Sequence, residues 1–130
     1  MIKTTKNPTF FVDIDGTLVK YRKFAELENS VLEPIQDVID TINNYYEQGA
    51  HIVITSARPD SYELFTKQEL ETIGVKYHQL ILGLGRGTRV VINDNDPQNP
   101  EISRSLGVNL NRDMGWEELD LTQIVSPYEV

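Results

Sequence analysis

The chain of 130 residues fits one domain, and its 39% hydrophobic and 25% charged residues permit a packed core. Its net charge of -8 disfavours a nucleic-acid partner, and the absence of cysteine excludes disulfides and thiolate chemistry. No apolar run is long enough to cross a membrane, and the first residues lack the apolar stretch of a signal peptide, so we expect one cytoplasmic domain over residues 1–130.

The first half of the chain is expected to form a strand, a helix and a second strand. Residues 9–12 are a short apolar run, typical of a strand buried in a parallel sheet. A helix is expected from about Ser30, where Ser-Val-Leu-Glu has the spacing of a capping box, and Gly49 is placed to end it. Residues 50–55 are again apolar and predict the second strand. The mixed, charged residues 19–30 predict a loop or a small hairpin.

The second half of the chain continues this alternation. Pro59 suits the first turn of a helix that ends near Gly74. Strands and helices that alternate in this way predict an α/β fold, a Rossmann-like three-layer αβα sandwich around an open, mainly parallel sheet. The elements expected after Gly74 are a strand at residues 79–82, a flexible loop at 83–87, a fourth strand at 89–92, a short helix at 100–106, an extended piece at 108–110 and a helical turn near Trp116.

Two clusters of acidic residues follow expected strands. Asp13 and Asp15 leave the first strand two residues apart, so their carboxylates can point to the same side. Asp94 and Asp96 follow the fourth strand within the run Asn-Asp-Asn-Asp. Open α/β sheets bind their ligands at the carboxyl ends of strands, so the two clusters are expected to meet. Several carboxylates in one place need a cation, and oxygen ligands in this number indicate Mg²⁺.

A further strand end carries hydroxyl and amide donors. The strand at 50–55 leads through Ser56, Ala57 and Arg58 into the helix that Pro59 opens. Backbone N–H groups at a helix start, beside a hydroxyl, form an anion site to which Arg58 can add charge. Acids, a metal ion and such donors are together the parts needed to handle a phosphoryl group. The same residues also fit a plain helix cap and a surface ion pair.

These motifs resemble those of the haloacid-dehalogenase-like hydrolase superfamily. Its first motif is Asp-x-Asp-Gly-Thr after a buried strand, which residues 13–17 match. Its second motif, a Ser or Thr that ends the next strand, matches Ser56, with Thr55 as the alternative one residue earlier. Its fourth motif, an acid that closes a later strand, matches Asp94. The resemblance covers residues 10–97 and implies a Mg²⁺-dependent phosphomonoester hydrolase.

The resemblance also implies roles for individual residues. Asp13 would be the nucleophile that forms an aspartyl-phosphate, and Asp15 would act as general acid and base. Mg²⁺ would be held by Asp13, by the backbone carbonyl of Asp15 and by Asp94, with Asp96 as a candidate helper. The residues expected to bind the substrate phosphate are Thr17, Ser56, Ala57, Arg58 and Arg86.

Two departures from the superfamily pattern bear on the site. No single Lys stands at the usual place of the third motif, and Lys67, Lys76 and Arg86 are all candidates for its role. The intervals between the motifs are taken up by one helix each, so no cap domain is expected. Without a cap, the site is open to bulky substrates unless a second copy of the chain or residues 19–30 cover it. In length, and in the loop after the 79–82 strand, the chain is similar to small capless members linked to capsular or surface-polysaccharide biosynthesis.

The substrate is expected to be a sugar phosphate or another small phosphorylated metabolite, and other functions stay open beside it. A phosphatase acting on nucleotides or polynucleotide ends uses the same residues. A receiver-like signalling domain also forms an aspartyl-phosphate, although its acid pair lacks Gly-Thr and its phosphorylated Asp follows a later strand. A catalytically silent Ca²⁺ or Mg²⁺ domain is the third alternative, which Pro97 and the missing Gly of an EF-hand loop oppose.

Overall fold

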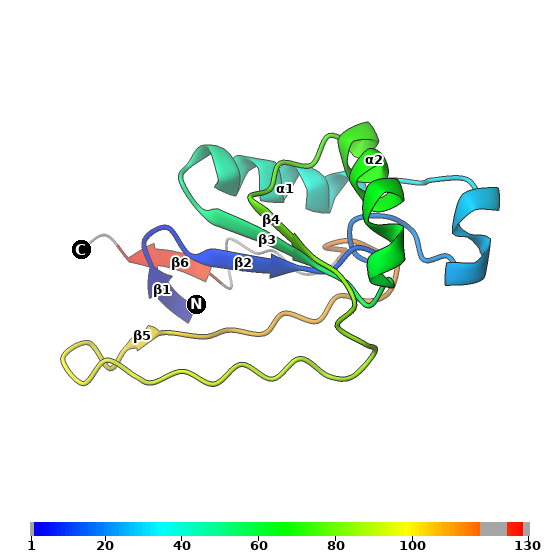
Figure 1. Cartoon of the computed structure of the whole chain (residues 1–130). Coiled ribbons are helices and arrows are strands. Elements are labelled where there is room, and N and C mark those ends of the chain that lie inside the picture. The colour runs from blue at the N-terminus through cyan, green and yellow to red at the C-terminus, as the bar shows by residue number, and fades with distance from the viewer. Residues whose placement is uncertain (1, 118–124, 129–130) are drawn as a thin grey trace.

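The computed structural model of the chain describes residues 2–117 and 125–128, with side chains described for residues 3–117. Within these residues the chain forms a small α/β fold with two sheets of three parallel strands each (Figure 1). The elements in chain order, with η for a 3₁₀ helix, are β1 (Ile2–Thr5), β2 (Thr9–Val12), η1 (Phe24–Asn29), α1 (Gln36–Glu47), β3 (His51–Thr55), η2 (Asp60–Tyr62), α2 (Glu63–Ile73), β4 (Gln79–Ile81), β5 (Ile102–Ser103) and β6 (Val125–Tyr128).

The larger part of the core is built on the sheet with the order β2-β3-β4. Val12 of β2 lies opposite Ile54 of β3, and Thr55 lies opposite Ile81 of β4. These strands confirm the first three strands expected from the sequence. The second sheet has the order β5-β1-β6, and none of its three strands was expected from the sequence.

The helix expected from Ser30 begins later, at Gln36, so the capping-box prediction is wrong. The residues before Gln36 bond to the turn after β2 instead: Lys20 N–H donates to the Glu33 carbonyl and Ile35 N–H to the Leu18 carbonyl, both at 2.8 Å. These long-range bonds hold the backbone out of the helix and override the local capping signal.

The two helix ends expected at glycines are confirmed. Gly49 follows α1 with a φ of 102°, and Gly74 ends α2 with a φ of 74°. A left-handed backbone costs glycine nothing and costs other residues energy, so glycine is the usual residue at such ends.

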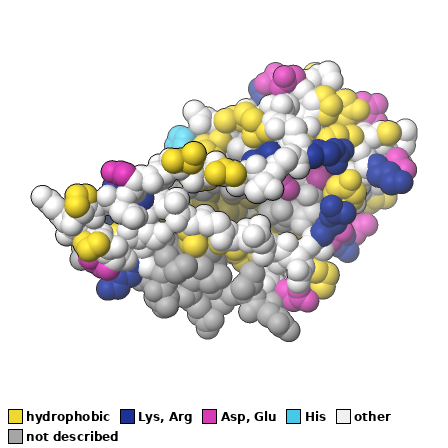
Figure 2. All heavy atoms as spheres, turned by 90° about the horizontal axis from the view of Figure 1, so that it is seen from below, with side chains coloured by type: hydrophobic (Ala, Val, Ile, Leu, Met, Phe, Trp, Pro, Cys, Tyr) yellow, Lys and Arg dark blue, Asp and Glu magenta, His cyan; other side chains and the backbone are white. Residues whose placement is uncertain are grey.

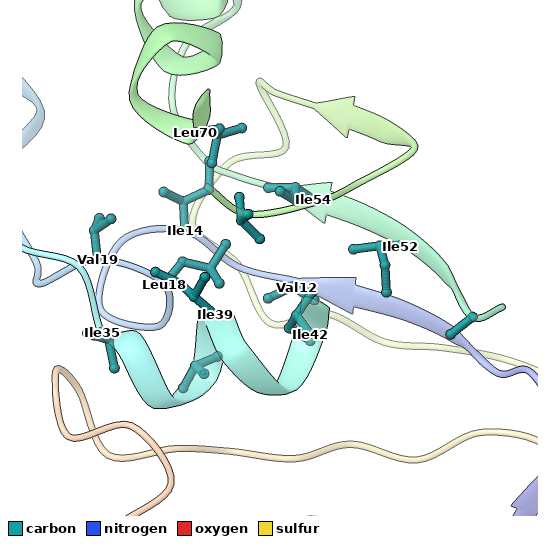
Figure 3. Close-up of a cluster of buried hydrophobic side chains, with 13 residues drawn as sticks. Val12, Ile14, Leu18, Val19, Ile35, Ile39, Ile42, Ile52, Ile54 and Leu70 are labelled. Atoms are coloured by element: carbon teal, nitrogen blue, oxygen red, sulfur yellow. The ribbon is translucent and has the colours of Figure 1, made fainter. Parts of the chain in front are cut away.

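The core lies between the β2-β3-β4 sheet and both α-helices, which cover the same face of that sheet (Figure 1). Val12, Ile52 and Ile54 of the sheet meet the apolar face of α1, and Leu70 of α2 reaches Ile14 just after β2 (Figure 3). Burying an aliphatic side chain of this size contributes about 1.5–3 kcal/mol. The packing therefore fixes the carboxyl ends of β2 and β3, where the candidate site begins.

The predictions for residues 89–92 and 100–106 are wrong. Residues 89–92 form no strand, and Val90, Val91 and Ile92 are 61–89% exposed. The chain from β4 to β5 runs in extended form on the side of the sheet away from the helices (Figure 1). Within the expected helix at 100–106, Ile102 and Ser103 form β5 and pair with β1.

Among the described residues, both α-helices lie on one face of the sheet, so the second helical layer of the expected sandwich is not confirmed. No helix in the described part of the chain is long and apolar enough to span a membrane.

Candidate active site

The first and second motifs lie side by side at one edge of the sheet. Val12 at the end of β2 pairs with Ile54 in β3, so Asp13 lies at the level of Thr55, the last residue of β3, and Ser56 comes next. Ser56 N–H donates to the Ile81 carbonyl at 2.9 Å and extends the β3–β4 pairing by one residue. The expected meeting of Asp13 and Ser56 is thus a direct result of parallel neighbouring strands.

A tight turn after β2 holds Asp13 in place. Gly16 N–H donates to the Val19 carbonyl at 2.7 Å, and Leu18 N–H donates to the Ile14 carbonyl at 2.9 Å. The side chains of Ile14 and Leu18 are buried and anchor the turn in the core. Gly16 has a φ of 88°, which a side chain would strain, and a Cβ there would lie 3.2 Å from Cγ of Arg112. The Gly of the first motif is therefore required by the backbone.

The carboxyl of Asp13 is open to a ligand. The residue is exposed, and it makes no ion pair with any side chain from residues 3–117. Partial shielding of the carboxyl from water raises the pKa of Asp13 above its usual 3.8, and the charge of Asp15 raises it further. The Ile14 backbone N–H, the charge of Arg89 and the Thr17 hydroxyl oppose this rise in pKa without cancelling it.

Asp15, by contrast, is held in a buried ion pair with Arg58. Arg58 Nε donates to Oδ2 of Asp15 at 2.9 Å, and Nη2 donates to Oδ1 at 2.8 Å. Arg58 is fully buried, and the Asp15 side chain is 8% exposed. Both oxygens of Asp15 thus accept from one guanidinium, the bidentate geometry that gives the strongest Arg–carboxylate pairs.

The remaining nitrogen of Arg58 extends this ion pair into α2. Nη1 donates to Glu69 at 2.9 Å and to the Thr66 hydroxyl at 3.2 Å. Glu69 also accepts from Arg22 at 2.8 Å, so two arginines and two carboxylates form one buried network. Burial alone lowers the pKa of Arg58, but the two carboxylates raise it overall and keep the guanidinium charged. Every nitrogen of Arg58 is engaged, so Arg58 does not have the free guanidinium that the expected phosphate role requires.

The expected phosphate-binding residues beside Arg58 are close to Asp13. Ser56 Oγ accepts from the Arg58 N–H at 3.0 Å, and its hydroxyl hydrogen is left to donate. This bond lies before η2, which has no side-chain cap, so Ser56 does not cap the helix. Ser56 is buried, whereas Ala57 and Thr17 are half-buried. The Thr17 hydroxyl interacts with Asp13. The strand register therefore places Ser56 and the following Ala57 beside the first motif, which itself contains Thr17.

The candidates for the third motif lie in different places. Lys67 pairs with Glu63 on the surface of α2, and Lys76 pairs with Glu47 at the end of α1. Arg86 lies over the ring of Phe24, 4.2 Å from its centre. The cation whose charge acts on Asp13 is Arg89, which sequence reasoning missed. The available signal was that Arg89 lies only three residues after Arg86, which was a candidate.

The fourth motif is not brought to Asp13 in this arrangement. Asp94 is exposed on the extended chain between β4 and β5, and its neighbour Asn93 donates to the Arg104 carbonyl beside β5. Asp96 accepts from the Gln98 N–H and the Asn99 amide, which lowers the pKa of Asp96 and uses it to form a turn.

The expected Mg²⁺ ligands therefore do not converge as the chain is arranged. Asp13 has a free carboxylate, Asp15 offers only its backbone carbonyl and Asp94 lies elsewhere. Among the described residues, no group of three or more acidic or histidine side chains could hold a metal ion.

Comparison with known proteins supports the fold. No family model matches the chain, and no curated protein matches it. The crystal structure of an MCSG target from Vibrio cholerae is similar, with 23% sequence identity and a TM-score of 0.53. The match covers 72% of this chain and 87% of that one. At this identity the likeness shows a shared small α/β fold and carries no activity with it.

Proposed function

We propose that the chain is a phosphomonoester hydrolase of the haloacid-dehalogenase-like superfamily in which Asp13 attacks phosphorus. The observation that supports this most is the contrast between the two acids of the first motif. Asp13, at the carboxyl end of β2, is an exposed residue whose carboxyl makes no ion pair with a side chain from residues 3–117, whereas Asp15 is fixed by Arg58. A free carboxylate beside hydroxyl and backbone donors is what nucleophilic attack on a phosphoryl group needs.

The proposed reaction has two steps. An oxygen of Asp13 forms a bond to phosphorus while the ester P–O bond breaks, and water then hydrolyses the aspartyl-phosphate to release phosphate. Ser56 and Thr17 have hydroxyls that can donate to the phosphoryl oxygens, and the charge of Arg89 favours the anionic group. Asp15 is the proposed proton donor to the leaving oxygen and the base for water. In that role at least one of its two bonds to Arg58 has to break.

Mg²⁺ is part of this proposal through the resemblance of the motifs, and when bound it would neutralise charge on the phosphoryl group. The ligands would be Asp13, the Asp15 backbone carbonyl and Asp94. Since Asp94 lies on the exposed chain between β4 and β5, binding by this set requires residues 89–97 to approach Asp13. The same approach would add a strand beside β2 and complete the sheet that the sequence predicts.

A phosphate-release assay tests the proposed function. A panel of sugar phosphates, nucleotides and other phosphorylated metabolites is incubated with the chain and Mg²⁺, and with the Asp13→Asn variant. The matched control is Asp40→Asn, which changes an exposed acid on α1. We expect release by the wild type and by the control, with no turnover by Asp13→Asn. Release that persists in Asp13→Asn would reject the nucleophile, and no release from any substrate would reject the function.

One observation favours a receiver-like phospho-aspartate domain as the second candidate. With both oxygens of Asp15 bonded to Arg58, the acid that the first motif offers for proton transfer is not free in this arrangement. Such a domain would take one phosphoryl group from acetyl phosphate and hold it. Release of many phosphates per chain separates the hydrolase from this alternative.

A further inference from the structure

Two exposed arginines lie in segments joined to the two motifs, and the guanidinium of each lies over an aromatic ring. Arg112 lies over Tyr21, 4.0 Å from the ring centre, and Arg86 lies over Phe24 at 4.2 Å. Tyr21 and Phe24 are three residues apart in the segment that follows the first motif. The rings therefore fix two positive charges along one short stretch of chain next to the nucleophile.

Backbone contacts tie both arginines to the candidate site. The chain at Arg112 is joined to the first-motif turn, since the Asp113 N–H donates to the Gly16 carbonyl at 2.9 Å. The loop that carries Arg86 is joined to the second motif, because Gly83 N–H donates to the Arg58 carbonyl at 2.8 Å and Leu84 N–H to the Ser56 carbonyl at 3.2 Å. The segment of Arg112 is thus joined to the first motif and the loop of Arg86 to the second.

Neither arginine has a carboxylate partner among the described side chains, although the chain is acidic. Among residues 3–117, neither Arg86 nor Arg112 makes a hydrogen bond or an ion pair, although acidic residues outnumber basic ones by 20 to 12. Five described basic residues, Lys20, Arg22, Arg58, Lys67 and Lys76, pair with a carboxylate, and the others do not. What sets Arg86 and Arg112 apart is that each lies over a ring.

Stacking on a ring prepares a guanidinium to bind an anion. The ring occupies one face, while the five N–H groups point outward in the plane and stay free to donate. The side chain is also held in position before binding, which reduces the entropy lost when a ligand binds. Figure 2 shows several Lys and Arg side chains at the right of the view, the end where η1 and the carboxyl ends of β2 and β3 lie in Figure 1.

We propose that Arg86 and Arg112 bind a second anionic group of the substrate, on the part that leaves when Asp13 takes the phosphoryl group. This inference rests on the proposed function and names its substrate class. The preferred substrate is a phosphomonoester whose leaving group carries a carboxylate or a further phosphate, such as a phosphorylated sugar acid or a bisphosphate. Neutral sugar phosphates are poorer substrates, because they leave both guanidinium groups without a partner.

Matched aryl phosphates test this preference. Phenyl phosphate, para-carboxyphenyl phosphate and para-phenylene bisphosphate differ in the charge of the leaving group, and kcat/KM is measured for each. We expect about a tenfold preference for one or both charged substrates, as two exposed ion pairs of ordinary strength give. A carboxylate-only or a phosphate-only preference would identify which of the two anions the site takes.

The variants show whether these arginines cause the preference. Arg112→Gln should weaken the preference while hydrolysing phenyl phosphate as the wild type does, and the double variant Arg86→Gln/Arg112→Gln should lose the preference. Arg104→Gln, an exposed arginine beside β5, should keep it. Equal kcat/KM for all three substrates in the wild type, or a preference that survives in the double variant, would overturn the proposal.

Binding of stable analogues separates this inference from the proposed function. Calorimetric titration compares benzylphosphonate with para-(phosphonomethyl)benzoate, neither of which can be hydrolysed. If no ester is turned over, the proposed function fails. The anion site would still be supported if the wild type binds the carboxylated analogue more tightly than benzylphosphonate and the double variant does not. Equal affinity of the two analogues for the wild type would reject the anion site whatever the activity.

Discussion

Residues 9–81 and residues 82–117 belong to the same small fold but are held in different ways. The first region contains three paired parallel strands, both α-helices and the buried ion network. The second is mostly extended, with Val90, Val91 and Ile92 exposed and only the short β5 paired. Asp13, Ser56 and Arg58 lie in the first region and Asp94 in the second. The difference shows that the end of the candidate site with Asp13, the proposed nucleophile, is fixed by packing, while the expected metal ligand of the fourth motif is not.

The largest expected effect concerns the buried network of the first region. Arg58→Leu removes the guanidinium and leaves Asp15 as a buried carboxylate without its partner, while Glu69 keeps only Arg22. We expect a loss of about 3–5 kcal/mol in the free energy of unfolding, measured with urea. Lys76→Leu, which breaks an exposed pair with Glu47, is the matched control and should cost about 1 kcal/mol or less. A loss for Arg58→Leu as small as that of the control would show that the network is not buried.

A pair of valines compares the two regions directly. Val53 in β3 is 3% exposed, whereas Val91 is 61% exposed. In the absence of Mg²⁺, Val53→Ala should therefore lower the free energy of unfolding by roughly 1–3 kcal/mol, the range for truncating a buried aliphatic side chain. Val91→Ala should change it by about 0.5 kcal/mol or less. Equal losses at the two positions would mean that residues 89–92 are packed in solution, and the comparison between the regions would fail.

Asp94→Asn tests whether magnesium recruits the second region. If Asp94 joins Asp13 at a shared ion, the Mg²⁺ concentration for half-maximal phosphate release should rise about tenfold, as expected for the loss of one carboxylate ligand. Asp96→Asn is the companion variant, and since Asp96 closes a turn it should raise this concentration less. An unchanged magnesium requirement in Asp94→Asn would show that Asp94 is not a ligand.

The smallest expected effect is a change in melting temperature when Asp13, the proposed nucleophile, is replaced. Because shielding from water raises the pKa of Asp13 in the folded chain, its charged form destabilises the fold at neutral pH. Asp13→Asn should therefore raise the melting temperature slightly at pH 7. The gain should disappear as the pH falls through the raised pKa of Asp13, where the wild-type carboxyl takes up a proton. A lower melting temperature of the variant at neutral pH would contradict this sign.

Local signals in the sequence predict the first region well and the second poorly. The apolar runs at 9–12, 50–55 and 79–82 form strands as expected, and Gly49 and Gly74 end the helices. The run at 89–92 carries the same signal, yet a strand also needs a neighbour with free hydrogen-bonding groups, and the local sequence does not reveal whether it finds one. Long-range bonds to Leu18 and Lys20 likewise displace the start of α1 from Ser30.

The sequence likewise predicts one part of the candidate site and not the other. The order of the motifs along parallel strands was enough to place Asp13 beside Ser56. The bond between Asp15 and Arg58 joins residues 43 positions apart, and Glu69 adds a second partner from α2. Which charged side chains pair in the core depends on the packed fold, so the sequence offered anion binding or a surface ion pair for Arg58 and did not predict its buried pairing with Asp15.

Detection of the phosphorylated residue is the most direct test of the proposed chemistry. The chain is mixed with a substrate found in the phosphate-release panel, quenched in acid within the first turnover, digested and analysed by mass spectrometry. A nucleophilic Asp13 predicts one added phosphoryl group on the peptide that contains residues 13–17, located at Asp13. Turnover with a phosphoryl group on a different residue, or with none on that peptide, would contradict it.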